Sequence, residues 1–513
     1  MCGLLFMDQQ AAGVSPQQAQ AALALQAWRG PDAQAVKSLS GGRWLLGHNR
    51  LAIIDPTAQA DQPMRSQDGR WWIVFNGEIY NHRALRERHQ LACRTQSDTE
   101  VLLEGYAQLG PAFLQELEGM YAFVILDTLS GTWLAARDPL GIKPLFVHQG
   151  AQGVCLASEA RVVAHLAQRP VDEASLAEWR WIRRPVPGHS YFAGVNELLP
   201  GTWLRSDGQT GRFWALTPAA RPFDQAEFEA TLSDVVREHE TSDVANVALL
   251  SGGIDSTLVL GLSQVQQAYS IGLPDQHEFD GARQTADQLG RALRCVTVTA
   301  EQVEAGWRAL TRLRGEPLSV PNEALIHAVC QAMAPNEKVV LTGEGADELM
   351  FGYDRLCRRA AEEQAAGRGL DAATFWSLYG YAEGQVPERL ADHWAELTRG
   401  KLALDAVEDW LFTVHLPGLL RRMDFAAMAA SKEARVPFAD RRLVALCYRQ
   451  PAATKIDAHH SKWPLRHMLS RLGLEGPLTR PKIGFAVQTA AGASRQAAYQ
   501  HFQDIVLKEL SWS

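Results

Sequence analysis

Residues 244–256 read Val-Ala-Asn-Val-Ala-Leu-Leu-Ser-Gly-Gly-Ile-Asp-Ser, and this stretch indicates the fold of the larger part of the chain. The apolar run that ends at Leu250 predicts a short buried strand, and Thr257–Val265 has the pattern of a helix. Ser251–Ser256 is therefore a glycine-rich loop between a strand and a helix. Its glycines let backbone amides approach an anion, and a helix N-terminus favours negative charge. We expect the loop to hold a phosphate group.

The sequence after the loop continues the alternation of strands and helices. Ala268–Leu273 and Cys295–Val298 predict strands, and Gly281–Leu293 between them predicts a helix. Lys338–Thr342 predicts a further strand after another helical stretch. Such alternation is typical of a parallel sheet that helices cover on both faces. From Ala360 onward the pattern is almost wholly helical.

The first two hundred residues have a different texture, rich in apolar runs bounded by glycine, asparagine and aspartate. These runs predict strands at Arg43–Ile54, Arg70–Phe75, Met120–Asp127 and Thr132–Ala136, and helices only at Gln17–Trp28 and Thr99–Leu109. Turn-rich sequence follows from Pro200 to Pro222. We place the domain boundary there, with one domain at residues 1–210 and a second at 211–513.

The composition is that of a globular enzyme. Hydrophobic residues make up 46% and charged residues 21% of the 513 residues, as in folded proteins generally. The net charge of -8 argues against nucleic acid as a partner. No apolar run reaches the roughly 20 residues of a membrane-spanning helix, so we expect no membrane partner. The seven cysteines include no Cys-x-x-Cys pair, which indicates a reduced, cytoplasmic protein.

A second acidic motif follows the strand that ends at Thr342. Gly343–Glu348 reads Gly-Glu-Gly-Ala-Asp-Glu, at the edge where parallel sheets bind ligands. Its carboxylates repel one another unless a cation compensates them. Asp255 in the first loop would likewise repel phosphate without a cation between them. We therefore expect magnesium, with Asp255 and Asp347 as ligands.

Cys2 directly follows the initiator methionine. Removal of Met1 would leave a thiol next to its own α-amine, so that nucleophile and base lie on one residue. Taken alone this pair means little. It gains weight from Arg50, from the Asn76-Gly77-Glu78 turn and from Asp98.

Together these motifs resemble the glutaminase domain of class II, N-terminal-nucleophile (Ntn) amidotransferases, and the whole chain resembles the asparagine synthetase family. The segments that carry the likeness are, in chain order, Met1–Leu4, Arg29–Asp32, Gly47–Asp55, Phe75–His82, Ser97–Glu100, Arg137–Pro144, Ser251–Ser256, Gly343–Glu348, Glu433–Phe438 and Lys482–Phe485. The resemblance implies an α+β N-terminal domain with a β-rich Ntn sandwich. It also implies an α/β ATP-pyrophosphatase domain with a parallel sheet and a helical C-terminal part.

For the first domain, the resemblance assigns roles in glutamine hydrolysis. Cys2 would attack the side-chain amide of glutamine, with Asn76 and the amide of Gly77 as the oxyanion hole. The residues expected to bind glutamine are Arg50, Asn76, Glu78 and Asp98. Arg50 would pair with the α-carboxylate, and Glu78 and Asp98 with the α-ammonium group.

For the second domain, the resemblance implies an ATP-activated acyl-adenylate, with magnesium as the cofactor. The expected ATP-binding residues are Leu250, Ser251, Gly252, Gly253, Asp255, Ser256, Ile271, Gly272, Gly343 and Glu344. Glu344 would also assist the attack of ammonia, and Lys462 would stabilise charge on the phosphate. Met120 and Ile142 are expected to line a channel for ammonia, with ordinary core packing as the alternative. The resemblance leaves a homodimer open.

The substrate calls for more than one hypothesis. Aspartate is the first expectation, but Trp28, Phe425, Ala430 and the Met350–Tyr353 stretch depart from the usual family pattern. We read these departures as bearing on the acceptor substrate. An amidotransferase or β-lactam-synthetase-like enzyme acting on a specialised carboxylate is the alternative. A tRNA-modifying pyrophosphatase would need a basic stripe and a cysteine pair, and a non-catalytic nutrient sensor would need damaged sites; the sequence has neither.

Overall fold

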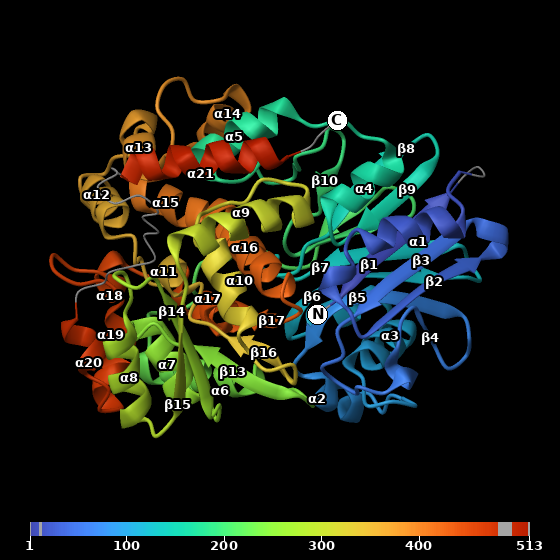
Figure 1. Ribbon diagram of the computed structural model, residues 1–513, viewed down its shortest axis with the longest axis horizontal. Helices are drawn as coiled ribbons and strands as arrows, with labels where there is room; N and C mark the ends of the chain where they lie inside the picture. Colours follow the sequence, from blue (N-terminus) through green and yellow to red (C-terminus); the bar gives the residue numbers. More distant parts are fainter. Residues whose placement is uncertain (1, 10–12, 481–494, 511–513) are drawn as a thin grey trace.

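The computed structural model describes residues 2–9, 13–480 and 495–510. Met1 and the Lys482–Phe485 motif lie outside these residues. The chain forms an N-terminal part built on two antiparallel sheets and a C-terminal part built on one parallel sheet and many helices (Figure 1). The predicted α+β sandwich followed by an α/β domain is confirmed.

The N-terminal part is a sandwich of two six-stranded sheets. In sheet order, the first contains β10 (Asn196–Glu197), β8 (Phe146–Gly150), β9 (Gly153–Ala157), β1 (Gly3–Gln9), β3 (Trp44–Arg50) and β2 (Ala33–Leu39). The second contains β12 (Thr210–Arg212), β11 (Thr202–Arg205), β7 (Thr132–Arg137), β6 (Gly119–Asp127), β5 (Trp71–Ile79) and β4 (Met64–Arg65). Strand β12 crosses the boundary expected after residue 210, which stays a prediction.

Helices cover the outer faces of the sandwich. They are α1 (Pro16–Ala24), α2 (His82–Arg88), α3 (Asp98–Leu109) and α4 (Ala160–Ala167). Helix α5 (Glu173–Ile182) packs instead against the C-terminal helices, where Trp181 contacts Trp376 (Figure 1). In β6, Ala122 and Val124 point into the core between the sheets, whereas Phe123 and Ile125 join the core under α3. The strand is therefore apolar on both faces, which explains its nearly unbroken hydrophobic run.

The C-terminal part is organised by a parallel sheet in the order β15 (Ala292–Thr297), β14 (Gln267–Gly272), β13 (Ala245–Leu249), β16 (Glu337–Leu341) and β17 (Glu433–Arg435). One face packs against α6 (Gln225–Glu238), α7 (Ile254–Leu262), α8 (Phe279–Gln288) and α19 (Trp463–Arg471). The other packs against α9 (Ala300–Arg314), α10 (Glu323–Gln331) and α16 (Leu416–Met428). Val247 and Ala248 on β13 belong to these two opposite cores.

The remaining helices form the end of the C-terminal part furthest from the sandwich, together with short pieces beside the sheet (Figure 1). They are α11 (Ala346–Leu349), α12 (Asp354–Ala365), α13 (Ala372–Tyr379), α14 (Glu388–Thr398), α15 (Ala403–Trp410), α17 (Arg441–Cys447), α18 (Ala452–Lys455), α20 (Gly476–Thr479) and α21 (Arg495–Glu509). In the core of α12–α15, Phe375 stacks on Trp394 and Trp410 packs edge-on against both. No helix among the described residues is long and apolar enough to cross a membrane.

Several predicted boundaries were wrong. The helix expected at Gly281–Leu293 ends at Gln288, and the next strand begins at Ala292 rather than Cys295. Gly290 has a φ of +64°, which ends the helix, and pairing with β14 then draws Ala292 into the sheet. The strand expected at Arg43–Ile54 stops at Arg50, and the helix expected at Gln17–Trp28 stops at Ala24. Strand β17 breaks the helical pattern expected after Ala360.

The two parts meet at the amino ends of the central parallel strands. Just before β13, Asp243 accepts a hydrogen bond from the Asp55 amide at 2.8 Å. Lys338 on β16 pairs with Asp32 at 2.7 Å. The carboxyl ends of the same strands point away from the sandwich, toward the phosphate loop.

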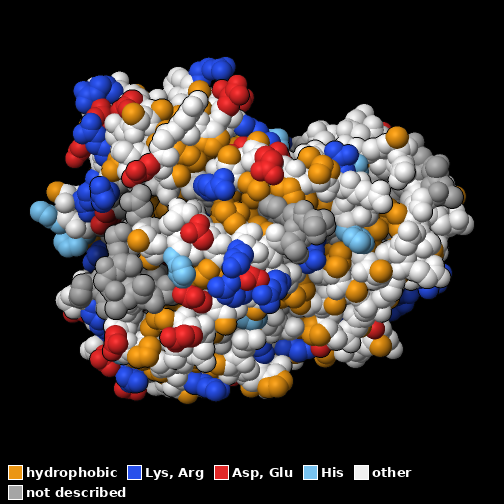
Figure 2. Space-filling model, turned by 45° about the horizontal axis from the view of Figure 1, so that its top comes forward, with side chains coloured by type: hydrophobic (Ala, Val, Ile, Leu, Met, Phe, Trp, Pro, Cys, Tyr) orange, Lys and Arg blue, Asp and Glu red, His pale blue; other side chains and the backbone are white. Residues whose placement is uncertain are grey.

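On the face shown in Figure 2, acidic and basic side chains are interspersed.

Candidate active sites

Cys2 lies buried at the start of β1. Its backbone amide donates to Asn76 Oδ1 at 2.9 Å, and its carbonyl accepts from Arg29 Nε at 2.9 Å. Burial raises the pKa of the thiol, against the opposing effects of nearby positive charge such as Arg50. The main chain of Cys2 is thus held on two sides, and its thiol depends on a local base for activation.

Asn76, Gly77 and Glu78 were expected in a turn, but they lie within strand β5, paired with β6 and beside Cys2. The Nδ2 atom of Asn76 is buried and has no hydrogen-bond partner among the described residues. A buried amide donor without a partner is costly and needs an explanation. A Cβ on Gly77 would lie 2.1 Å from the Met120 carbonyl oxygen, so only glycine permits this approach of β5 to β6. This part of β5 therefore offers the side-chain amide of Asn76 as a donor beside Cys2.

Two buried carboxyl groups lie in this region: Glu78 in β5 and Asp98 at the start of α3. Burial raises the pKa of both, and the negative charges of Glu433 and Asp98 raise that of Glu78 further. Asp98 accepts hydrogen bonds from the amides of Ile79 and Thr99 at 2.9 and 2.8 Å. Arg435 of β17 approaches Glu78 at 3.6 Å. The pair would be stabilised by a further cation, as an α-ammonium group would provide.

Arg50 ends β3 and is held by the loop that follows it. Its guanidinium donates to the carbonyl of Thr57 at 2.7 Å and pairs with Asp61 at 2.6 Å. A second nitrogen donates to the Asp55 carbonyl. The structure thus brings Arg50 to the rim of the Cys2 region, with its donors engaged by the loop. Its contact with a substrate carboxylate stays a prediction.

A buried charge cluster that the sequence reasoning missed lies behind Cys2. Arg29, fully buried, pairs with Glu159 at 2.6 Å and with Asp424 at 2.8 Å. Asp424 also pairs with Lys143 at 3.3 Å. Asp424 belongs to the C-terminal part, whereas the other three belong to the N-terminal part. Arg29 and Lys143 lie in segments quoted for the resemblance, but nothing in the sequence indicated that they share one partner.

The phosphate loop has the predicted strand–loop–helix setting. Gly252 has a φ of +79°, and a Cβ there would lie 2.6 Å from the backbone of Gly281. The hydroxyls of Ser251 and Ser256 lie 3.0 Å apart, and Ser251 Oγ accepts from the Gly253 amide at 3.2 Å. Gly253 is the N-cap of α7, so the positive N-terminal end of this helix faces the loop.

The loop opens into a cavity of about 570 Å³. The predicted ATP-binding residues that line it are Leu250, Ser251, Gly252, Gly253, Asp255, Ser256, Ile271, Gly343 and Glu344. Asp347 and Lys462 line it too. Gly272 does not: it packs against His277, where a Cβ would lie 2.5 Å from that side chain. Sequence reasoning missed the apolar wall formed by Leu325, Ile326 and Val329 of α10, and Met423 of α16.

Lys462 joins the two carboxylates that were expected to bind magnesium. Its Nζ atom lies 2.6 Å from Asp255 Oδ2 and 2.6 Å from Asp347 Oδ1. Although burial opposes its charge, the two carboxylates raise the pKa of Lys462. Gly352 keeps this contact open, because a Cβ there would overlap Asp347. Two carboxylates that converge on one cationic position are a donor set that suits magnesium, so the residues fit that ion.

Glu344 lies at the wall of the cavity beside a cation. Its carboxylate is 3.8 Å from Arg422 on α16, and both side chains are only partly exposed. A Cβ on Gly343 would lie 2.8 Å from Asp255, so the acidic turn packs directly on the phosphate loop. The cavity therefore gathers phosphate donors, two carboxylates, a lysine and a candidate base.

Trp28, Phe425 and Ala430 do not line the cavity, whereas Gly352 of the Met350–Tyr353 stretch does. The bearing of these departures on the acceptor stays a prediction. Trp28 packs edge-on against Phe425 at 5.2 Å, between the N-terminal and C-terminal parts. Arg314 covers the other side of Phe425 at 4.6 Å. Phe351 also points away from the cavity, into the helical core beside Lys455.

Met120 and Ile142 share one apolar core with residues of the C-terminal part. Both are buried and pack in a cluster that includes Ala346 and Phe438. Met120 pairs with Glu78 across β5 and β6, and Ala346 belongs to the acidic turn, so both regions contribute residues to this cluster. Dense packing accounts for both residues, and their part in an ammonia channel stays a prediction.

Comparisons with known proteins agree with the two-part organisation. Residues 1–214 match the family model of the glutamine amidotransferase domain, and residues 227–511 match that of asparagine synthase. A protein of Mycobacterium bovis, named provisionally as a glutamine-hydrolysing asparagine synthetase, is 31% identical and aligns over 95% of this chain and 87% of its own length.

Two further relatives have the same name in other bacteria. Glutamine-hydrolysing asparagine synthetase 1 of Bacillus subtilis is 27% identical over 86% of this chain and 79% of its own length. Asparagine synthetase B of Escherichia coli is 29% identical over 63% of this chain and 59% of its own length.

Proposed function

The chain belongs to the glutamine-hydrolysing asparagine synthetase family, and from that premise we propose that it amidates the side chain of aspartate with ammonia taken from glutamine. The enzyme is a carbon–nitrogen ligase with a glutaminase domain of the Ntn type. ATP activates the acceptor in this family. The identity of the acceptor, the use of magnesium and the roles of individual residues are the proposal.

At the first site, the thiol of Cys2 attacks the side-chain carbonyl of glutamine. The carbon–nitrogen bond breaks, ammonia leaves, and water then hydrolyses the thioester to glutamate. The amide of Asn76, unpartnered in the structure, donates to the oxyanion. Glu78 and Asp98 hold the α-ammonium group. The α-amine of Cys2 is the local base, which requires that Met1 be removed.

At the second site, an oxygen of the acceptor carboxylate attacks the α-phosphorus of ATP, and pyrophosphate leaves. Ammonia attacks the acyl carbon of the adenylate, a proton passes to Glu344, and AMP departs. The phosphate loop and Lys462 stabilise the charge on the leaving pyrophosphate. Asp255 and Asp347 would hold magnesium, which supplies further charge neutralisation at the phosphates when it is bound.

The observation that carries this half of the proposal is the meeting of Ser251–Ser256, Glu344 and Lys462 in one cavity. Activation of a carboxylate and attack on it require phosphate donors and a base within reach of the same acyl group. Glu344 can take up the proton that the attacking ammonia loses.

The test is pyrophosphate release by processed enzyme with ATP, magnesium and glutamine, across a panel of carboxylates. We expect aspartate to stimulate release most strongly and asparagine to accumulate with it. Release that another carboxylate stimulates, with no response to aspartate, would contradict the acceptor assignment and leave the ligase class intact.

A further inference from the structure

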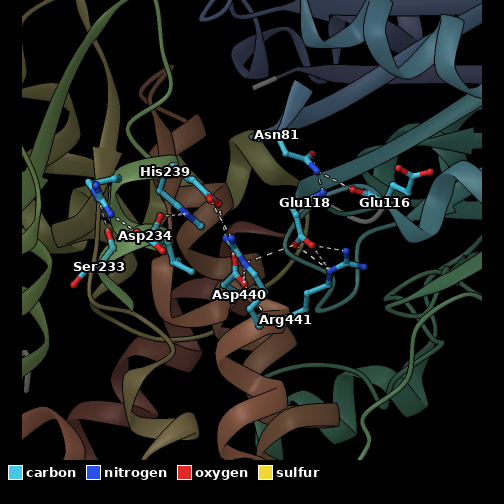
Figure 3. A network of polar contacts seen from close by, with 12 residues as sticks. Asn81, Glu116, Glu118, Ser233, Asp234, His239, Asp440 and Arg441 are labelled. Atoms are coloured by element: carbon cyan, nitrogen blue, oxygen red, sulfur yellow. Dashed lines mark hydrogen bonds and ion pairs between the residues drawn. The ribbon is translucent and has the colours of Figure 1, made fainter. Parts of the chain in front are cut away.

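An ion pair between the two parts of the chain joins Glu118, beside the end of β5, to Arg441 (Figure 3). Glu118, just before β6, accepts from Arg441 Nε with both carboxylate oxygens, at 3.1 and 3.0 Å. Arg441 also donates to the carbonyl of Gln115 at 3.0 Å. Both side chains are mostly shielded, with 19% and 18% exposed. Because water screens it less, this pair holds its two segments together more strongly than an exposed surface pair would.

On the N-terminal side, the backbone of Glu118 is hydrogen-bonded to the two residues that follow β5, the strand that carries Glu78. Its carbonyl accepts from the Tyr80 amide at 2.8 Å, and its amide donates to Asn81 Oδ1 at 3.1 Å. The next residues, Gly119 and Met120, pair with Ile79 and Glu78 across β5 and β6. A shift of Glu118 would therefore move the strand that carries Glu78.

On the C-terminal side, Arg441 begins α17, directly after the segment 437–440. Asp440 caps α17 and accepts from the amide of Arg442 at 2.8 Å. Phe438 and Ala439 lie against Gly345 in the acidic turn, where a Cβ would be 3.4 and 3.3 Å from their backbone atoms. Arg441 thus lies two residues after Ala439, which packs against Gly345 between Glu344 and Asp347.

We propose that Glu118 is a positioning residue for the glutamine site, and that its ion pair with Arg441 links that site to the acidic turn of the nucleotide site. The proposal rests on the proposed function, since it assigns Glu78 to glutamine binding. The link works in both directions, because a coupling free energy between two binding sites is reciprocal. Occupancy of the nucleotide site would then raise the affinity for glutamine.

The experiment compares Glu118→Gln with Glu116→Gln in the full-length processed enzyme. Glu116 lies in the same loop, and its carboxylate pairs with Arg88 and His89 of its own domain. We expect Glu118→Gln to raise KM for glutamine about tenfold in the presence of ATP and acceptor. Synthesis from ammonium chloride should stay within about twofold of wild type, and Glu116→Gln should leave both unchanged.

A double variant gives a second readout. If Glu118 acts through Arg441, Glu118→Gln combined with Arg441→Gln should raise KM no further than either change alone. Additive effects, or an equal loss of ammonia-dependent and glutamine-dependent synthesis, would overturn the proposal. An unchanged KM in Glu118→Gln would overturn it too. If the wild-type enzyme hydrolyses no glutamine, the proposed function itself fails and this inference falls with it.

Discussion

The two candidate sites differ in how their carboxyl groups are neutralised. Around Cys2, burial raises the pKa of both Glu78 and Asp98, and Asn76 Nδ2 has no hydrogen-bond partner among the described residues. Around the phosphate loop, Asp255 and Asp347 are neutralised by Lys462, a residue of the chain itself. At the first site Arg435 approaches Glu78 only at 3.6 Å, so we expect the substrate to complete the neutralisation, whereas at the second site Lys462 contacts both carboxylates directly.

The largest test of this contrast is Cys2→Ala. Glutamine-dependent synthesis should fall by roughly 10⁴-fold or more, because a nucleophile cannot be replaced by positioning alone. Synthesis from ammonium chloride should persist, since the nucleotide site is untouched. Amide formation with each nitrogen source measures both, and Cys93→Ser, a cysteine outside the site, is the control. Equal loss with both sources would remove the division of labour between the sites.

Lys462→Met should impair synthesis with both nitrogen sources and spare glutamine hydrolysis. Loss of the ammonium group leaves Asp255 and Asp347 facing each other and removes a donor to the leaving pyrophosphate. We expect pyrophosphate release to drop by about 10²- to 10³-fold with either nitrogen source. Glutamine hydrolysis, measured as glutamate formed, should be retained. A variant that loses only glutamine-dependent synthesis would contradict the assignment.

The pH dependence of glutamine binding sharpens the comparison. Burial and the neighbouring carboxyl groups raise the pKa of Glu78, so part of the enzyme holds it neutral at a pH where an exposed glutamate is charged. The α-ammonium group of glutamine prefers the anion. KM for glutamine should therefore fall as pH rises through this raised pKa, by at most about tenfold per pH unit for one proton. In Glu78→Gln this dependence should be lost.

The smallest expected effect concerns the contact between Trp28 and Phe425. A double-mutant cycle with Trp28→Ala and Phe425→Ala should give a coupling of about 1 kcal/mol in the free energy of unfolding, typical of an edge-on aromatic pair. The apparent affinity for the acceptor should not change in Phe425→Leu. A changed choice of acceptor would restore the reading that these residues contact substrate.

Sequence reasoning succeeded where a local pattern fixes the structure. The run before Ser251 and the glycines after it are sufficient to predict a strand, a phosphate loop and a helix. It failed where a distant partner decides. Strand β17 has three residues and forms only because β16 offers it an edge. Ala292 left its expected helix to pair with β14.

The sites show the same division. The residue types around Cys2 and the phosphate loop were predictable, because their chemistry restricts them. The contact of Lys462 with Asp255, 207 positions away in sequence, and the shared partner of Arg29 and Lys143 were not. The contact between Trp28 and Phe425 was not predictable either: a departure from a family pattern shows that a position differs, but not what it contacts.

The central claim is that one chain moves nitrogen from glutamine to an ATP-activated carboxylate. The most direct test supplies glutamine labelled with ¹⁵N at its side-chain amide, together with ATP, magnesium and aspartate, and follows the label. The account predicts ¹⁵N in the side-chain amide of asparagine, with glutamate, AMP and pyrophosphate formed in equal amounts. Pyrophosphate release without labelled amide, or glutamate formation unlinked to any ATP turnover, would contradict it.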